Sequence, residues 1–219
     1  MRGRAGFFCV RPGVSAVGGD PRDIGETGAT TRENEMGWKE FFGFGKRKSS
    51  EAPSLTDLGL NDLKVGYFVD YDMKTWEVVA CHTYDWGRGD VSREWQLKSA
   101  DDTLYLEREA DDEEAWSVSR PLPFVRLGEA VRRHILENED PPDEIDYDGV
   151  VYYLESFGGG RFFRGGEGAG RDVLAWDYED EAGERYLSIE QWGEEEFEAA
   201  SGEPAEPYQF TNILPREIG

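Results

Sequence analysis

Short stretches in which apolar and polar residues alternate dominate the chain from residue 64 to residue 120. They are rich in Val, Tyr, Trp and Thr, which favour β-strands. The connections between them are short and contain Gly or Asp, and short connections favour antiparallel pairing of successive strands. The pattern therefore predicts an antiparallel meander of five strands, at residues 64–72, 75–86, 92–99, 103–109 and 115–120.

The pattern changes to a helical one after residue 124. Leu127, Val131 and Ile135 recur every four residues, and two prolines follow at 141–142. Proline ends a helix, so we expect one helix over about 125–138. Strand patterns then return, and they continue to about residue 215. The sequence thus predicts a mainly β protein with one connecting helix.

The second set of strands resembles the first at a fixed spacing. An offset of 81 residues, without gaps, pairs Val69 with Val150 and also aligns a series of aromatic and acidic residues. Rare aromatic residues at matched spacing indicate a tandem duplication. The aligned anchors are Trp95, Tyr105, Glu109 and Trp116 in the first copy and Trp176, Tyr186, Glu190 and Phe197 in the second.

This duplication predicts the architecture. We expect two antiparallel meanders of about five strands, at residues 63–124 and 144–215, that form one pseudo-symmetric barrel or sandwich, with residues 125–143 as the helical connector. Bulky aromatic side chains would fill the interior. The side chains expected in this core are Trp76, Trp95, Tyr105, Trp176 and Tyr186.

Several stretches resemble one bacterial family, domain of unknown function 4178 (DUF4178). They are "LKVGYFVDYDMKTWEVVACHTYDW", "SREWQL", "DTLYLEREADDEEAWSVSRPLPF" and "DPPDEIDYDGVVYYLES". The family has no assigned catalytic residues, so the resemblance implies none here. It does imply a genomic context of phage-shock protein A-like membrane-stress proteins, small membrane proteins and polyamine-synthesis enzymes.

The N-terminal part has a different composition. Residues 1–35 lack periodicity and are expected to be disordered, and the resemblance supports Met36 as the biological start. Residues 36–62 contain aromatic residues on one face of a short helix, a basic cluster and a linker. This segment suits either a membrane interface or an acidic partner helix, or it is a frayed terminal turn. The contact residues would be Trp38, Phe41, Phe42, Lys46, Arg47 and Lys48.

Charge limits the classes of partner. The net charge is −23, with 47 Asp and Glu against 24 Lys and Arg. An acidic surface repels phosphate groups, so we expect no nucleic-acid binding. This composition suits adaptation to high salt, and an ordinary acidic bacterial protein is the alternative. The two cysteines, Cys9 and Cys81, have no metal-binding or redox spacing, which favours a reducing cytoplasm, with peripheral contact at the inner membrane as an option.

Candidate chemistry is sparse. Glu144, Asp146, Asp148 and Glu155 have the spacing of ligands in a calcium loop of the EF-hand type. However, the flanking residues predict strands, so a turn at Asp148–Gly149 is the favoured interpretation. The glycine-rich stretch 158–171 lacks the Lys and Ser/Thr of a phosphate loop and predicts a long flexible hairpin loop. We expect no cofactor and no structural or catalytic metal.

Three functional hypotheses follow. The first is a non-enzymatic interaction or scaffold protein near the bacterial inner membrane, attached through residues 36–48, with phage-shock protein A-like proteins as partners. The second is a β-barrel that binds a small molecule or a polyamine. The third, an enzyme, is the least favoured because the sequence shows no paired catalytic set.

Overall fold

The computed structural model describes residues 58–110 and 114–216. Within them, strands predominate and α1 is the one α-helix, so the predicted mainly β class is confirmed. No helix in this described part is long and apolar enough to cross a membrane. In chain order, the elements are η1 (Leu60–Asp62), β1 (Phe68–Tyr71), β2 (Lys74–Gly87), β3 (Asp90–Lys98), β4 (Thr103–Ala110), β5 (Glu114–Leu122), η2 (Phe124–Leu127), α1 (Glu129–Asn138), β6 (Glu144–Tyr147), β7 (Val150–Phe163), η3 (Arg164–Gly166), β8 (Arg171–Asp180), β9 (Tyr186–Gln191), β10 (Phe197–Ala205), η4 (Pro207–Gln209) and β11 (Thr211–Leu214).

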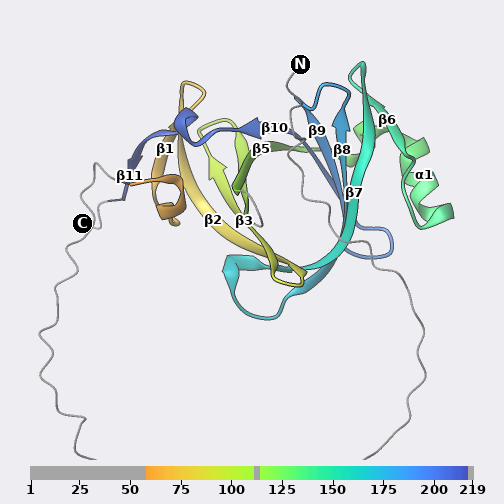
Figure 1. Cartoon of the computed structure of the whole chain (residues 1–219), viewed down its shortest axis with the longest axis horizontal. Helices are drawn as coiled ribbons and strands as arrows, with labels where there is room; N and C mark the ends of the chain where they lie inside the picture. The colour runs from red at the N-terminus through yellow and green to blue at the C-terminus, as the bar shows by residue number, and fades with distance from the viewer. Residues whose placement is uncertain (1–57, 111–113, 217–219) are drawn as a thin grey trace, which may run out of the picture.

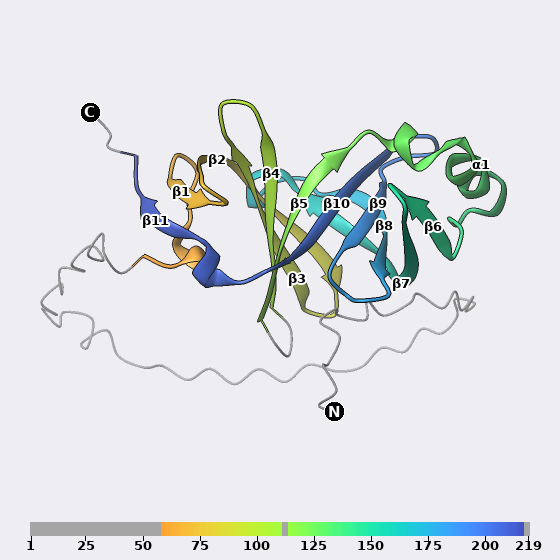
Figure 2. The same cartoon turned by 90° about the horizontal axis from the view of Figure 1, so that it is seen from above.

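The strands form one antiparallel sheet of 11 strands in the order β11-β1-β2-β3-β4-β5-β10-β9-β8-β7-β6. An additional pairing of β2 with β7 joins the ends of the inner eight strands into a partial ring (Figure 1). β1 and β11 extend the sheet beyond the ring at one end, and β6 extends it at the other. β5 and β10 run side by side across the opposite side of the ring (Figure 2).

The two long strands β2 and β7 each pair with two strands in turn along one edge, and with a third strand, β3 or β8, along the other. Each has 14 residues and pairs first with its own hairpin partner, β1 or β6, and then with the other long strand. Each also contains an irregularity in register at the same place, between Val78 and Ala80 in β2 and between Leu154 and Ser156 in β7. A bulge bends a strand and increases its twist, which lets one strand leave its hairpin and turn toward the ring.

Two hydrophobic cores lie on the outer face of the ring, and residues from the C-terminal end of the chain, including Phe210 and Ile213, join the first. The first packs the outward side chains of β3, β4 and β5 under η1, β1 and β11, and it includes Trp76 and Trp95. The second packs the outward side chains of β8 and β9 under α1 and β6, and it includes Trp176, Val131 and Ile135. Because strand side chains alternate between faces, the polar residues between these core positions point into the ring.

Four predictions need correction. The helix is shorter than 125–138, because Gly128 at φ 93° separates η2 from α1. Tyr105 and Tyr186 do not join the tryptophans in a common core; they lie on the inward face with Gln96 and Ser188. The register of the repeat and the extent of the glycine-rich loop also differ from the prediction.

The offset of 81 residues holds only for β3–β5 against β8–β10. β1 and β2 match β6 and β7 at an offset of 76, so Val69 on β1 lies at the place of Ile145, not Val150. The difference arises because residues 164–170 form a longer connection than residues 88–89. Glycines 158–160 and residues up to Phe163 belong to β7, so only 164–170 form a loop. The strand order of the two halves is the same, and the duplication itself stays a prediction.

Candidate functional site: an acidic cavity inside the ring

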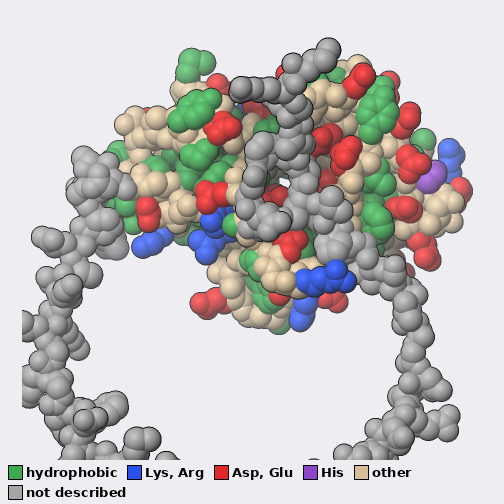
Figure 3. All heavy atoms as spheres, in the orientation of Figure 1, with side chains coloured by type: hydrophobic (Ala, Val, Ile, Leu, Met, Phe, Trp, Pro, Cys, Tyr) green, Lys and Arg blue, Asp and Glu red, His purple; other side chains and the backbone are tan. Residues whose placement is uncertain are grey.

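The inward face of the ring lines a partly enclosed cavity of about 2240 Å³. Fourteen Asp and Glu residues line it, against two arginines and one histidine. The outer surface is acidic as well, and Asp and Glu side chains are spread over the face shown in Figure 3. Carboxylates inside the cavity differ from those on the surface, because the surrounding protein removes part of their hydration.

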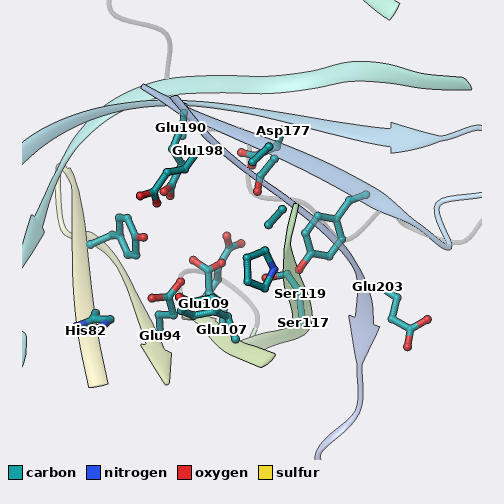
Figure 4. A pocket seen from close by; sticks show the side chains of 18 of the residues that line it. His82, Glu94, Glu107, Glu109, Ser117, Ser119, Asp177, Glu190, Glu198 and Glu203 are labelled. Carbon is teal, nitrogen blue, oxygen red and sulfur yellow. The ribbon is translucent and has the colours of Figure 1, made fainter. Parts of the chain in front are cut away.

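Four carboxylates form a group that we term the carboxylate cluster: Glu94, Glu107, Glu190 and Glu198. They come from β3, β4, β9 and β10, so both halves of the chain contribute. Figure 4 shows Glu94 and Glu107 on one side of the cavity and Glu190 and Glu198 on the other, with their side chains directed toward one another. Glu109 and Asp177 line the same space.

The electrostatics of the cluster are dominated by repulsion. Burial raises the pKa of Glu94 well above its usual range, and the charges of Glu107, Glu190 and Glu198 raise it further. No basic group is among the causes of this shift. A carboxyl group in such surroundings either keeps its proton or requires a cation nearby.

Tyrosines connect the cluster to the walls. Tyr84 on β2 hydrogen bonds Glu190; burial, followed by nearby carboxylates, raises the pKa of Tyr84 well above its usual value. Tyr186 on β9 crosses the neighbouring β10 at Gly202 and hydrogen bonds Ser117 and Ser119 on β5. Both tyrosine hydroxyls therefore stay protonated at neutral pH, and the two side chains fix the inner walls of the strand ring.

Aromatic side chains gather where β2 meets β7. Neighbouring rings of His82, Tyr84, Trp86, Phe162 and Trp192 lie with their centroids 5.0–5.3 Å apart. All five residues line the cavity. Trp86 faces Gly160 across the strand pair, and any Cβ at that position would overlap the indole ring. Gly160, which the sequence pattern assigned to a loop, thus belongs to a strand and makes room for the Trp86 ring.

The cations of the cavity lie at this same aromatic end. Arg164 and Arg171 flank the loop between β7 and β8. The Arg171 guanidinium forms an ion pair with Glu196 and lies 5.1 Å from the centre of the Trp192 ring. His82 accepts a hydrogen bond at Nδ1 from the backbone N–H of Gly165, at 3.2 Å. Burial, with a smaller effect of Arg164, lowers the pKa of His82, so the ring is neutral at pH 7.

The residues of the cavity suit the binding of a ligand better than metal coordination or thiol chemistry. Among the described residues, no three His, Cys, Asp or Glu side chains are placed to hold one metal ion. Burial raises the pKa of the Cys81 thiol, which disfavours a reactive thiolate. The carboxylates are near enough to affect one another but too dispersed to share a single ion, which fits a ligand with several separated positive charges.

The calcium-loop candidates lie on a hairpin. Glu144 and Asp146 are on β6, Glu155 is on β7, and the turn between the strands has positive φ at Asp148 and Gly149. An EF-hand loop requires flanking helices. The favoured interpretation, a turn at Asp148–Gly149, is therefore confirmed. The other predicted contact residues, in segment 36–48, lie outside the described residues.

The repeat anchors divide between the two faces of the sheet. Trp95 and Trp116 stack in the first outer core, at 5.6 Å between centroids, and Trp176 is buried in the second core, against which Phe197 packs. Tyr105, Glu109, Tyr186 and Glu190 line the cavity. Glu94, Glu107 and Glu198 were not among the candidate residues predicted from the sequence. The signal was available, because acids alternate with core residues in Glu94-Trp95 and Leu106-Glu107.

Comparison with known proteins identifies the family. Residues 64–207, most of the described chain, match the family "Domain of unknown function (DUF4178)". The chain belongs to this family. It is also similar to an uncharacterized protein of Aquifex aeolicus (strain VF5), with 29% identity over 182 residues, which cover 79% of this chain and 94% of that relative. No solved structure matches it. The DUF4178 match takes in both halves of the ring.

Proposed function

We propose that this DUF4178 protein binds an organic polycation, such as a polyamine, inside the acidic cavity. The observation that carries the proposal is the carboxylate cluster: four acids from both halves meet in a partly enclosed space, and the charged groups that shift Glu94 are all acids. Glu94 has neither a hydrogen-bond partner nor an ion-pair partner among the described residues. A bound ammonium group would supply the missing counter-charge.

Several features favour a flexible amine over a compact ion. The cavity of about 2240 Å³ exceeds the range of roughly 300–1,000 Å³ that is usual for sites of drug-sized ligands. The acids are spread along its walls, so a linear molecule with amino groups at intervals can contact several of them in turn. Side chains that accept hydrogen bonds, such as Ser117, Ser119 and Ser188, line the space between the acids.

Adaptation to high salt does not account for these residues. Acidic surface residues increase solubility because water hydrates them fully. Carboxylates directed into a cavity lose part of that hydration and repel one another, which costs stability. A cationic ligand that offsets this loss of stability would explain why the carboxylates point into the cavity.

Binding can be tested by isothermal titration calorimetry of the full-length protein with spermidine and spermine. Magnesium chloride at matched ionic strength controls for non-specific charge screening. We expect saturable binding of the polyamines and none of magnesium. The double variant Glu94→Gln/Glu107→Gln should weaken spermidine binding by about 100-fold, since each charge-assisted hydrogen bond contributes about 1.5–3 kcal/mol.

A matched control separates the cavity from total charge. The variant Glu129→Gln/Glu137→Gln on α1 removes the same charge from residues that do not line the cavity. It should bind spermidine as the wild type does. Equal loss of affinity in both double variants would show that the polyamine binds the acidic surface in general, and the cavity would lose its role.

The scaffold hypothesis is a separate proposal. It depends on segment 36–48 and on phage-shock protein A-like partners, and the described residues do not bear on either. Flotation with anionic liposomes, with and without residues 36–48, is the measurement that decides it. A polyamine-binding ring and a membrane-attached segment are compatible in one chain.

A further inference from the structure

Acidic side chains continue beyond the carboxylate cluster along one wall of the cavity. Asp177 and Glu179 lie at alternate positions of β8, and both line the cavity. Side chains at alternate positions of a strand point to the same face, so both are directed into the ring. Figure 4 shows Asp177 on the same wall as Glu190 and Glu198. Asp177 and Glu179 therefore extend the cluster as a row that runs along β8.

The strand register gives the spacing of this row. Glu190 on β9 lies opposite Ala175 on β8. Asp177 is two residues further along β8, and Glu179 is two residues beyond Asp177. A β-strand advances about 3.3 Å per residue, so successive acids are about 6.6 Å apart along the wall and the row is about 13 Å long. The wall thus presents carboxylates at regular intervals.

The row leads to an exposed part of the cavity. Asp177 is 8% exposed and accepts a hydrogen bond from the Ser156 hydroxyl at 3.2 Å. Glu179 is half-buried and has neither a hydrogen-bond partner nor an ion-pair partner among the described residues. The β8–β9 turn at residues 181–184 lines the cavity and is exposed. A ligand that enters past this turn meets Glu179 first and the carboxylate cluster last.

Glu179 resembles Glu94 in its surroundings. Burial raises the pKa of Glu179, and the charges of Glu155 and Asp180 raise it further. The charged groups that act on it are all acids, as they are for Glu94. Both ends of the row therefore favour a cation nearby.

We infer that the ligand of this cavity is a linear amine with at least three ammonium groups, whose inner end lies within the carboxylate cluster and whose outer end is bound by Glu179. This inference rests on the proposed function and names the length of the ligand and its outer contact in the same site. Two amino groups separated by three or four methylene groups are about 5–6 Å apart in an extended chain, since each bond is about 1.5 Å long. This spacing is close to that of the acids. A diamine spans one interval of the row, whereas a linear triamine extends from the cluster to Glu179.

Three amines test the inference by calorimetric titration of the full-length protein. Spermidine is a linear triamine, tris(2-aminoethyl)amine carries the same charge in a compact branched molecule, and 1,4-diaminobutane is a linear diamine. The wild type should bind spermidine with a dissociation constant about 10-fold lower than that of the branched triamine, because only the linear molecule reaches both ends of the row.

One variant identifies the outer contact. Glu179→Gln keeps the size of the side chain and should weaken spermidine binding about 10-fold, while leaving the branched triamine and the diamine unchanged. Glu137→Gln on α1 removes the same charge outside the cavity and should change none of the three affinities.

The outcomes separate this inference from the proposed function. Equal affinity for the two triamines, with no selective effect of Glu179→Gln, would show that the ligand does not extend along β8, while the polycation site stands. Equal weakening of all three amines by Glu179→Gln would show that this residue acts only through the total charge of the cavity, and the inference would again be wrong. If the wild type binds none of the amines, both proposals are wrong.

Discussion

The two halves of the molecule have the same strand order but line the cavity differently. β1 to β5 and β6 to β10 each begin with a hairpin, continue in a 14-residue strand with a bulge at the same position, and end in three more strands. After the bulge, β2 directs His82, Tyr84 and Trp86 inward. The corresponding positions of β7 are Gly158, Gly160 and Phe162. At two of these three positions the first half therefore supplies a ring where the second supplies glycine.

This difference shows how two similar halves close into a ring. They meet at two seams, β2 with β7 and β5 with β10. At each seam an aromatic side chain on the inner face lies over a glycine. Trp86 of the first half lies over Gly160 of the second, whereas Tyr186 and Gly202 both belong to the second half, and the Tyr186 side chain crosses Gly202 to reach Ser117 and Ser119 on β5. An aromatic side chain in place of Gly160 or Gly202 would not fit beside the ring that already lies there. The halves are similar in backbone, and a glycine makes room for an aromatic ring at each seam. Variants at these glycines and in the outer cores test this arrangement.

The largest effect is expected in the outer cores. Trp95 and Trp176 occupy matching positions, and each is almost fully buried. Trp95 donates a hydrogen bond to the Leu63 carbonyl at 3.1 Å, and Trp176 donates one to Asp140 at 2.7 Å. Replacement of either by Ala should lower the free energy of unfolding by about 3–5 kcal/mol. Chemical denaturation measures this loss, with the exposed Tyr208 replaced by Ala as control.

Loss of stability in only one of these two variants would contradict the expected equivalence of the two halves. In that case one half folds without its core tryptophan, and the two cores are not equivalent. Loss of stability in both variants, with an unchanged Tyr208→Ala control, indicates that the two outer cores contribute similarly to the free energy of unfolding.

The next effect concerns the β5–β10 seam. A Cβ at Gly202 would overlap both the Tyr186 ring and the backbone carbonyl of Val118. Because a backbone atom cannot move aside as a side chain can, Gly202→Ala should cost about 3 kcal/mol. Adding Tyr186→Leu removes the ring but not the carbonyl, so it should not restore stability. Recovery of the wild-type denaturation midpoint in the double variant would contradict the backbone contact.

The β2–β7 seam should respond more mildly. At Gly160, the overlap is mainly with the Trp86 ring, and the nearest backbone atom, the Asp85 carbonyl oxygen, is at 3.0 Å. Gly160→Ala should therefore cost about 1–2 kcal/mol, and adding Trp86→Leu should recover part of this loss. Gly159→Ala is the matched control, because its Cβ would meet Leu174 at an ordinary 3.4 Å. A Gly159→Ala variant as unstable as Gly160→Ala would show that loss of chain flexibility, not the indole ring, matters here.

These glycines also show what sequence analysis could and could not establish. The alternating pattern predicted the strands and the mainly β class, because alternation depends only on neighbours along the chain. It could not identify Gly158–Gly160 as part of β7, since the ring that requires glycine at position 160 belongs to Trp86, more than 70 residues earlier. The carboxylate cluster was hidden for a related reason. Glu94 and Glu198 lie on strands from different halves, and only ring closure brings them together.

The smallest effect on stability is expected from the ionisation of Glu94 in the cavity, a residue that only one half of the chain supplies. The first half places Glu94 where the second half has Ala175. In the folded protein the pKa of Glu94 is raised by burial and by neighbouring carboxylates, whereas in the unfolded chain it is near the usual 4.5. The folded state therefore binds this proton more tightly. The resulting stabilisation is complete below pH 4.5 and is lost as pH rises through the raised pKa.

Glu94→Gln removes this titration while keeping the shape of the side chain. The variant should match the wild type at pH 4 and become progressively more stable than the wild type above pH 4.5, with a constant difference once Glu94 is fully ionised. Denaturation midpoints measured from pH 4 to pH 9 give the curve, and Glu129→Gln on α1 is the control. Spermidine should reduce the difference at pH 8, because the bound cation stabilises the ionised Glu94 only in the wild type. If the two denaturation curves keep a constant separation across the whole pH range, Glu94 does not titrate in the cavity, and the mutual repulsion of the carboxylates is not what a ligand relieves.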